Sequence, residues 1–191
     1  LEKLGMPRLP EDSFWIVGPS LWDTFCALGV PSEQLNDAIE FYRERYNAIG
    51  WAENECYPGI LAQLSKLRAE EFILCLATSK PKVSAKKITD YFGISEYLTY
   101  LFCSELDGTR SDKTELLEYG VKHSDSQFDQ CLMIGDREHD IIGAKNNSML
   151  SIGADYGYGQ EGELYRAGAN KITLNSHELY EAIKSLQGER I

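Results

Sequence analysis

Residues Gln130 to Lys145 read Q-C-L-M-I-G-D-R-E-H-D-I-I-G-A-K, and this stretch decides the fold. It opens with a short apolar run typical of a buried β-strand, and Gly135 lets the backbone turn sharply where that run ends. Asp136 follows at the strand tip, and Asp140 lies one turn later on the same side of the expected helix. Two carboxylates so placed suit a hard cation such as Mg²⁺. The alternative is that Asp136 caps the helix and Asp140 faces solvent.

The same alternation of strand and helix extends over the chain from Tyr57 onward. We expect strands at residues 72–77, 99–103, 130–134, 150–153 and 171–174. We expect a helix opened by Pro58 and Gly59, and further helices at residues 81–92, 112–121, 136–146, 159–167 and 176–186. Strands that alternate with helices predict a parallel sheet covered on both faces, so the fold class is α/β. In such sheets ligands bind beyond the carboxyl ends of the strands.

The first part of the chain has little strand signal. Residues 21–28 are typical of a short helix, and apolar residues recur at helical spacing between Leu35 and Ile49. We therefore predict a small all-helical domain at residues 1–56 and an α/β core at residues 57–191. The first four residues, followed by Gly5, are typical of a helix end, so we expect the natural protein to begin earlier.

Two further strand tips carry groups that suit an anion. Thr78 and Ser79 follow one strand and precede a helix, where a hydroxyl and free N–H groups can bind an anion or simply cap the helix. Lys113 lies at the start of a later helix, in the phrase S-E-L-D-G-T-R-S-D-K. The helix dipole disfavours a cation there, so a nearby anion would account for it. The alternative is a solvated surface lysine.

In their order, spacing and strand context these residues resemble the motifs of the haloacid dehalogenase superfamily, in its phosphoglycolate phosphatase and 5′-nucleotidase-like branch. The resemblance implies a Rossmann-like parallel sheet with a helical cap at residues 1–56. It implies that Thr78, Ser79 and Lys113 bind the phosphoryl group, with Thr78 and Lys113 assisting catalysis. It also implies that Asp136 and Asp140 hold Mg²⁺.

The family also has a strand ending in D-x-D-G-T, whose first aspartate attacks phosphorus, and the sequence contains no such segment. The phrase E-L-D-G-T at Glu105 to Thr109 does not replace it, because its first residue is a glutamate and it comes after Thr78. The resemblance places the absent strand centrally, between the strands that carry Thr78 and Asp136. We therefore expect the chain as given to be inactive by itself, through truncation rather than as a natural pseudoenzyme.

The expected function is that of a Mg²⁺-dependent phosphomonoester hydrolase, acting through an aspartyl-phosphate on a small phosphorylated metabolite. The alternative is an inactive domain that binds phosphate, Mg²⁺ or a partner. Phosphotransfer or dehalogenation on the same fold is a weaker hypothesis, and the acidic pair disfavours dehalogenation because that reaction needs no Mg²⁺ ligands.

Composition limits the partners. With 30 acidic against 19 basic residues the net charge is −11, which disfavours nucleic acid as a partner. No apolar run reaches the roughly 18 residues of a membrane helix. The five cysteines lack C-x-x-C spacing, and we interpret them as reduced core residues of a cytoplasmic protein. An exposed sheet edge would also allow two copies to pair as a homodimer.

Overall fold

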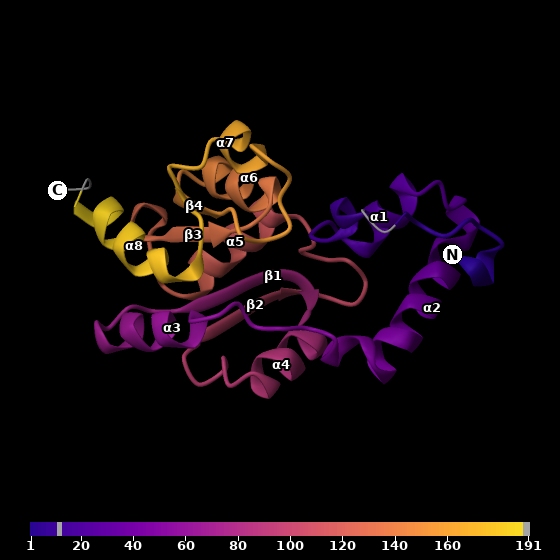
Figure 1. The fold of residues 1–191 in the computed structure, drawn as a ribbon, viewed down its shortest axis with the longest axis horizontal. Helices are drawn as coiled ribbons and strands as arrows, with labels where there is room; N and C mark the ends of the chain where they lie inside the picture. Colours follow the sequence, from indigo (N-terminus) through magenta and orange to yellow (C-terminus); the bar gives the residue numbers. More distant parts are fainter. Residues whose placement is uncertain (11–12, 189–191) are drawn as a thin grey trace. The chain divides into compact units, whose positions relative to one another are not determined.

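The computed structural model describes residues 1–10 and 13–188. The chain divides into two compact units, Leu1–Glu55 and Cys56–Ile191, which we call the helical unit and the α/β unit (Figure 1). None of the described helices is long and apolar enough to cross a membrane. The predicted site residues all belong to the α/β unit.

The helical unit is built around two α-helices, as the sequence predicted. These are α1 (Leu21–Ala27) and α2 (Leu35–Ala48), with 3₁₀ helices at Glu2–Leu4, Phe14–Ile16, Ser32–Gln34 and Gly50–Ala52. Its core contains Phe25, Ala38 and Ile39. Tyr42 and Ile49, expected on the same apolar face of α2, are 41% and 54% exposed. This core therefore buries only the first half of α2.

In the α/β unit strands and helices alternate, which confirms the predicted fold class. The strands are β1 (Cys75–Pro81), β2 (Tyr100–Ser104), β3 (Leu132–Gly135), β4 (Leu150–Ala154) and β5 (Lys171–Thr173). The helices are α3 (Ile60–Ala69), α4 (Lys82–Tyr91), α5 (Lys113–His123), α6 (Glu138–Asn146), α7 (Glu163–Ala167) and α8 (Leu179–Gly188). Two 3₁₀ helices lie at Phe128–Gln130 and Ser176–Glu178.

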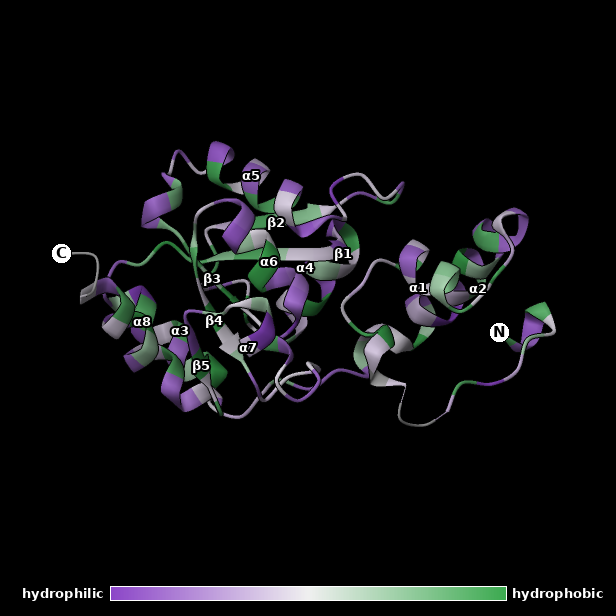
Figure 2. Ribbon diagram, turned by 90° about the horizontal axis from the view of Figure 1, so that it is seen from above, coloured by the Kyte–Doolittle hydropathy of each residue, from purple (hydrophilic) through white to green (hydrophobic). Residues whose placement is uncertain are grey.

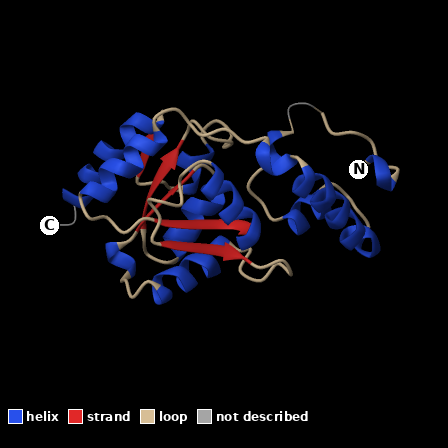
Figure 3. Ribbon diagram, turned by 90° about the horizontal axis from the view of Figure 1, so that it is seen from below, coloured by secondary structure: helices blue, strands red, loops and turns tan. Residues whose placement is uncertain are grey.

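The described strands form two separate sheets, and the parallel pairing that the sequence predicted is confirmed. β1 pairs with β2, while β3, β4 and β5 form a second sheet, and every pair is parallel. Figure 3 shows the strands in these two groups. The break falls between β1 and β3, because neither strand hydrogen-bonds to the other. This is the place where the family resemblance puts a further strand.

Strand β1 begins and ends later than predicted. Phe72 and Leu74 precede it and pack against the core beneath α3 and α8. The strand continues through Pro81 because it stays paired with β2, with Thr78 opposite Cys103 and a register shift before Pro81 pairs with Ser104. Thr78 therefore lies within the strand. Because the N-cap of α4 is Pro81, the capping interpretation of Thr78 is excluded.

Two apolar clusters fix the sheets in place. On one face, α3 and α8 pack on β4 through Leu67, Ile183 and Ile152, and Figure 2 shows that both helices carry patches of hydrophobic and of hydrophilic residues. On the other face, α5 and α6 pack on β3 through a cluster that also contacts Ala77 of β1. This second cluster spans the break and packs β1 and β3 on one common core, although the strands do not pair.

The cysteines form no disulfide, and the prediction that they are core residues is wrong for Cys26 and Cys75. Cys103 in β2 is buried, whereas Cys26 and Cys75 are exposed. Cys26 lies on the solvent side of α1, and Cys75 is the first residue of β1. Apolar runs contain exposed positions at their ends, and sequence alone does not reveal which positions these are.

Candidate active site

Lys113, the first residue of α5, connects β1 of one sheet to α6, the helix that follows β3 of the other sheet. Its Nζ donates to the carbonyl oxygen of Ala77 in β1 at 2.9 Å, and it lies 2.9 Å from Oδ1 of Asp140 in α6. The lysine and aspartate side chains are 10% and 11% exposed. Asp140 is therefore the anion that the sequence required beside a lysine at a helix N-terminus. Acceptors among the described residues engage two of the three N–H groups of the Lys113 ammonium, which leaves the third N–H for a ligand.

Asp140 is buried, and both of its oxygens have partners. Besides the contact of Oδ1 with Lys113, Oδ2 accepts the backbone N–H of Arg137 at 3.2 Å. The carboxylate approaches the end of β3 so closely that a Cβ on Gly135 would lie 2.2 Å from Cβ of Asp140. Glycine is needed at this position for the close approach. Asp140 thus holds Lys113 directly, and its expected contact with a metal stays a prediction.

Asp136 is half-buried and has one open oxygen. Its Oδ2 accepts the backbone N–H of Tyr158 at 2.9 Å, while Oδ1 receives no hydrogen bond from the described residues. A Cβ on Gly157 would lie 2.2 Å from Cβ of Asp136, so the segment from Tyr156 to Glu163, which we call the tyrosine loop, packs directly on this carboxylate. One fixed and one open oxygen make Asp136 the better placed cation ligand of the two acids.

Thr78 and Ser79 have different partners. The Thr78 hydroxyl oxygen accepts the backbone N–H of Lys80 at 3.2 Å, and its own hydrogen has no acceptor among the described residues. Ser79 instead donates its hydroxyl to the carbonyl oxygen of Ser111 at 2.8 Å. Thr78 can therefore donate to an anion as it stands. Ser79 would have to give up its bond to Ser111 first, and its expected phosphate contact stays a prediction.

The loop after β2 forms a closed turn. Glu105 N–H donates to the carbonyl oxygen of Thr109 at 2.9 Å, and Asp107 Oδ1 accepts the N–H of Thr109 at 2.9 Å. This second bond holds the pKa of Asp107 below its usual value. Glu105 forms an ion pair with Arg110. Both carboxylates are engaged within the turn, which agrees with rejecting E-L-D-G-T as the nucleophile segment.

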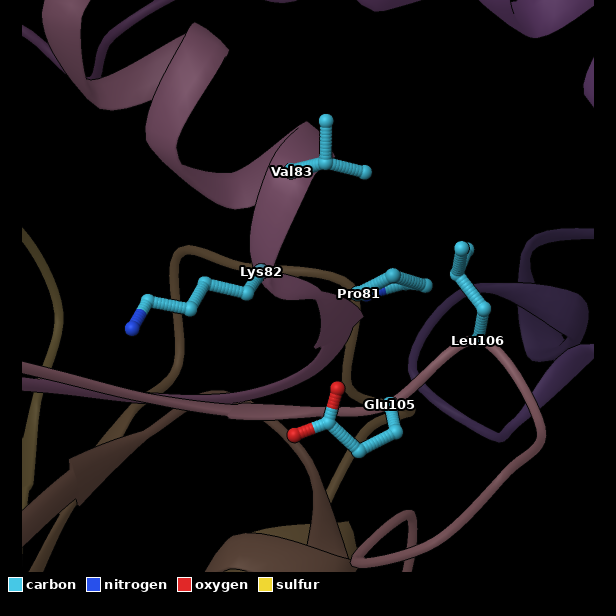
Figure 4. A pocket seen from close by; sticks show the side chains of 5 residues that line it. All are labelled: Pro81, Lys82, Val83, Glu105 and Leu106. Atoms are coloured by element: carbon cyan, nitrogen blue, oxygen red, sulfur yellow. The ribbon is translucent and has the colours of Figure 1, made fainter.

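An open pocket of about 350 Å³ lies between this loop and the start of α4 (Figure 4). Its lining residues are Pro81, Lys82, Val83, Glu105 and Leu106. Val83 and Leu106 are 66% and 54% exposed, so the pocket has an apolar rim with one lysine beside it. It opens where β1 and β2 end, at the edge of the α/β unit that carries Thr78.

Two tyrosines lie near Asp136. Tyr57 and Tyr156 pack edge to face, with ring centroids 4.9 Å apart. Burial raises the pKa of the Tyr57 phenol, and the charge of Asp136 raises it further. Burial, with smaller effects from Tyr57 and Asp136, raises the pKa of Tyr156 to about 12. Both phenols therefore stay protonated at neutral pH. Neither tyrosine was among the predicted site residues.

A buried ion pair connects the tyrosine loop to α6, and sequence reasoning missed it. Arg137 Nε donates to Glu163 Oε1 at 2.8 Å, and both side chains are 8% exposed. Glu163 also accepts the backbone N–H groups of Glu138 at 2.8 Å and Gln160 at 2.9 Å. Burial alone would raise the pKa of Glu163, but these hydrogen bonds outweigh it and the net shift is downward. The one signal in the sequence was that Arg137 directly follows Asp136, a predicted metal ligand.

The described residues contain no group of three or more His, Cys, Asp or Glu side chains able to hold a metal. The open Oδ1 of Asp136 nevertheless fits Mg²⁺, which keeps several waters and uses few protein carboxylates. A closed site for zinc would need more ligands than these residues provide. The described donor set therefore fits a hydrated magnesium ion held through one carboxylate.

Comparison with known proteins finds relatives over nearly the whole chain. The haloacid dehalogenase-like hydrolase family matches residues 1–154. A 5′-nucleotidase from Pseudomonas aeruginosa is 38% identical over 149 residues, which cover 78% of this chain and 67% of that protein. The tyrosine-protein kinase PtkA from Mycobacterium tuberculosis is 32% identical over 187 residues, which cover 96% of this chain and 64% of that protein.

A solved structure agrees closely with the fold. The crystal structure of a predicted phosphatase from Clostridium acetobutylicum superposes with a TM-score of 0.92 at 38% identity, covering 96% of this chain and 86% of that chain. The present chain spans about two thirds of the length of the two curated relatives.

Proposed function

Because this chain belongs to the haloacid dehalogenase-like hydrolase family, we propose that it forms the phosphoryl-binding and metal-binding part of a Mg²⁺-dependent phosphomonoesterase. The observation that carries the proposal is the arrangement around Lys113. This buried lysine keeps one N–H free, and Asp136, which directly follows β3, is a carboxylate with one open oxygen. A cationic donor and a cation ligand at one strand edge together suit a phosphoryl group.

The phosphoryl oxygens are bound by Lys113 and Thr78. The Thr78 hydroxyl and the third ammonium N–H of Lys113 are the donors that the described residues leave unused. Asp140 and the carbonyl oxygen of Ala77 hold the ammonium group in place before a ligand arrives. Donors fixed in advance favour the transition state because they need not reorganise during the reaction.

Asp136 would hold Mg²⁺ with the oxygen that its hydrogen bond leaves open, and the cation would supply positive charge against the negative charge that develops on the phosphoryl oxygens. The Tyr158 N–H keeps Oδ2 engaged, so the carboxylate presents its other oxygen to the site. Asp140 supports the arrangement from one helical turn away, through its contact with Lys113.

The nucleophile is an aspartate on a strand that seats between β1 and β3, where the two sheets are not joined. Its carboxylate oxygen forms a bond to phosphorus while the bond from phosphorus to the leaving oxygen breaks, and that oxygen takes up a proton. Water then attacks phosphorus, releases inorganic phosphate and restores the carboxylate. Such a strand would also pair the free edges of β1 and β3, and unpaired edges are unfavourable.

The substrate is a small phosphorylated metabolite, of the kind hydrolysed by the relative named a 5′-nucleotidase. The pocket rimmed by Val83 and Leu106 is an open space of about 350 Å³ where β1 and β2 end, and we assign part of the leaving group to it. A homodimer and a cytoplasmic location remain predictions of the sequence.

The test is phosphate release by the full-length protein from a panel of phosphomonoesters, with Mg²⁺ and with a chelator. Asp136→Asn should reduce Mg²⁺-dependent release by about 100-fold or more. It should leave the fold intact, because the asparagine carbonyl can still accept the Tyr158 N–H. Retained activity in this variant would refute the metal assignment.

A second candidate function is phosphotransfer to an acceptor other than water. The relative named a tyrosine-protein kinase supports it, since that protein is 32% identical over 96% of this chain. Labelled ATP separates the two functions. Label in inorganic phosphate supports hydrolysis, label on a tyrosine-containing protein supports transfer, and binding of phosphate without turnover supports the inactive alternative.

A further inference from the structure

The tyrosine loop contacts Asp136 on two sides. The N–H of Tyr158 donates to the Asp136 carboxylate at 2.9 Å. On the main-chain side, a Cβ on Gly159 would lie 2.6 Å from the Asp136 carbonyl oxygen, so the loop backbone passes against this residue with no space for a side chain. The orientation of the Asp136 carboxylate therefore depends on where this loop lies.

Glu163 fixes the far end of the loop. It is the first residue of α7 and is 7% exposed. One carboxylate oxygen accepts from Arg137 Nε and Glu138 N–H, and the other accepts from Gln160 N–H. Three donors converge on a single buried carboxylate, from the helix that follows Asp136 and from within the loop itself. This connects the loop to the residues on the C-terminal side of Asp136.

We propose that Glu163 is a positioning residue for Asp136. By fixing the tyrosine loop to the start of α6, it keeps the Tyr158 N–H on Oδ2 and leaves Oδ1 directed to the cation. Glu163 makes no hydrogen bond or ion pair with Asp136, Lys113 or Thr78, so it acts through the loop. The inference rests on the proposed function, because it concerns the same cation.

The test is Mn²⁺ binding to the full-length protein, followed by the electron paramagnetic resonance signal of free Mn²⁺. Mn²⁺ stands in for Mg²⁺ and needs no turnover. Glu163→Gln removes one acceptor and should raise the Mn²⁺ dissociation constant by about tenfold, and Glu163→Ala by up to about 100-fold. Phosphate release at saturating metal should fall much less than metal affinity, because Lys113 and Thr78 are unaffected.

The matched control is Glu161→Gln, which removes the same charge two residues earlier on an exposed side chain. It should bind Mn²⁺ as the wild type does. All titrations are made below the unfolding temperature of each variant, with circular dichroism to verify the fold. If Glu163→Ala does not fold, the Glu163→Gln titration decides.

The outcomes separate this inference from the proposed function. Wild-type protein that binds Mn²⁺ no more tightly than Asp136→Asn overturns the metal site, and the positioning role with it. Mn²⁺ binding that is lost in Asp136→Asn but stays within twofold of wild type in folded Glu163→Gln overturns the positioning role alone. Equal weakening in Glu161→Gln and Glu163→Gln also overturns it, because the effect would then be one of general charge.

Discussion

The two sides of the candidate site are held in opposite ways. On the lysine side, made of Ala77, Lys113 and Asp140, the charges are buried and pair with each other. On the tyrosine-loop side, Asp136 is half-buried and keeps one oxygen open, and the buried ion pair lies further away at Glu163. The difference teaches that a family motif contains both charges used to build the site and charges left for ligands. Asp136 and Asp140 belong to one motif and fall on different sides of this division.

The lysine side should lose most stability when its pair is broken. Lys113→Met leaves Asp140 buried without its cation, and we expect the free energy of unfolding to fall by about 3–5 kcal/mol. Urea unfolding measures it. The double variant Lys113→Met, Asp140→Leu should recover much of the loss, since an apolar pair can replace a buried ion pair.

Lys122→Met is the matched control in the same helix. Lys122 pairs with Glu118 on the surface, where its side chain is 63% exposed, so we expect a change of at most about 1 kcal/mol. A similar loss in Lys113→Met and Lys122→Met would mean that the lysine side is not the buried scaffold described above.

Two glycines allow the two sides to be compared with the same change. Gly135→Ala would place a Cβ 2.2 Å from Cβ of Asp140 in a buried site, and we expect a loss of about 1–3 kcal/mol in unfolding free energy. Gly157→Ala meets Asp136 equally closely, but beside a half-buried carboxylate instead of a buried one, so we expect about 0.5 kcal/mol or less.

The order of the two glycine variants in Mn²⁺ affinity should differ from their order in stability. In Gly157→Ala the tyrosine loop must move away from Asp136, so Mn²⁺ affinity should fall although stability hardly changes. The comparison would fail if Gly157→Ala were the less stable of the two variants, or if its Mn²⁺ dissociation constant matched that of the wild type. Thermal unfolding and a metal titration on the same samples give both readings.

A further expected effect is a pH dependence on the tyrosine-loop side. The pKa of Glu163 lies below its ordinary value of 4.5, because its hydrogen bonds outweigh burial. Because the pKa of Glu163 is lower in the folded state, its ionised carboxylate stabilises the protein at pH values above the unfolded-state pKa. This stabilisation is lost as the pH falls through the folded-state pKa. The free energy of unfolding of the wild type should therefore exceed that of Glu163→Gln by about 1 kcal/mol near neutral pH. This difference should shrink below pH 4.5. A difference that grows on acidification would contradict this account.

Much of the fold could be predicted from the sequence, because hydrophobic periodicity and the Gly and Pro residues that end helices and strands are local signals. The elements around Gly135, Asp136 and Lys113 occur where they were predicted, within a few residues. The start of β1 did not, because Phe72 and Leu74 are as apolar as strand residues but pack against the core beneath α3 and α8, and the strand begins only at Cys75. Pairing depends on the neighbouring strand, which a window of sequence does not contain.

The site was predicted as a set of residues but not as an arrangement. The sequence predicted Thr78, Lys113, Asp136 and Asp140 as site residues because they follow strands, and parallel strands end at a common edge of the sheet. Which oxygen of each carboxylate is free could not be read in advance, since it depends on the N–H groups of Tyr158 and Arg137. Glu163 carried no motif at all, because its role comes from donors that are distant along the chain.

The sequence by itself determined the α/β class, the family resemblance and the residues at the strand tips, since spacing and turn chemistry act over a few residues. Tertiary structure alone decided that Lys113 joins Ala77 to Asp140 and that Asp136 keeps an open oxygen. The physical reason is that hydrogen bonds and ion pairs are satisfied in space, by whichever groups the packed helices and strands bring within about 3 Å.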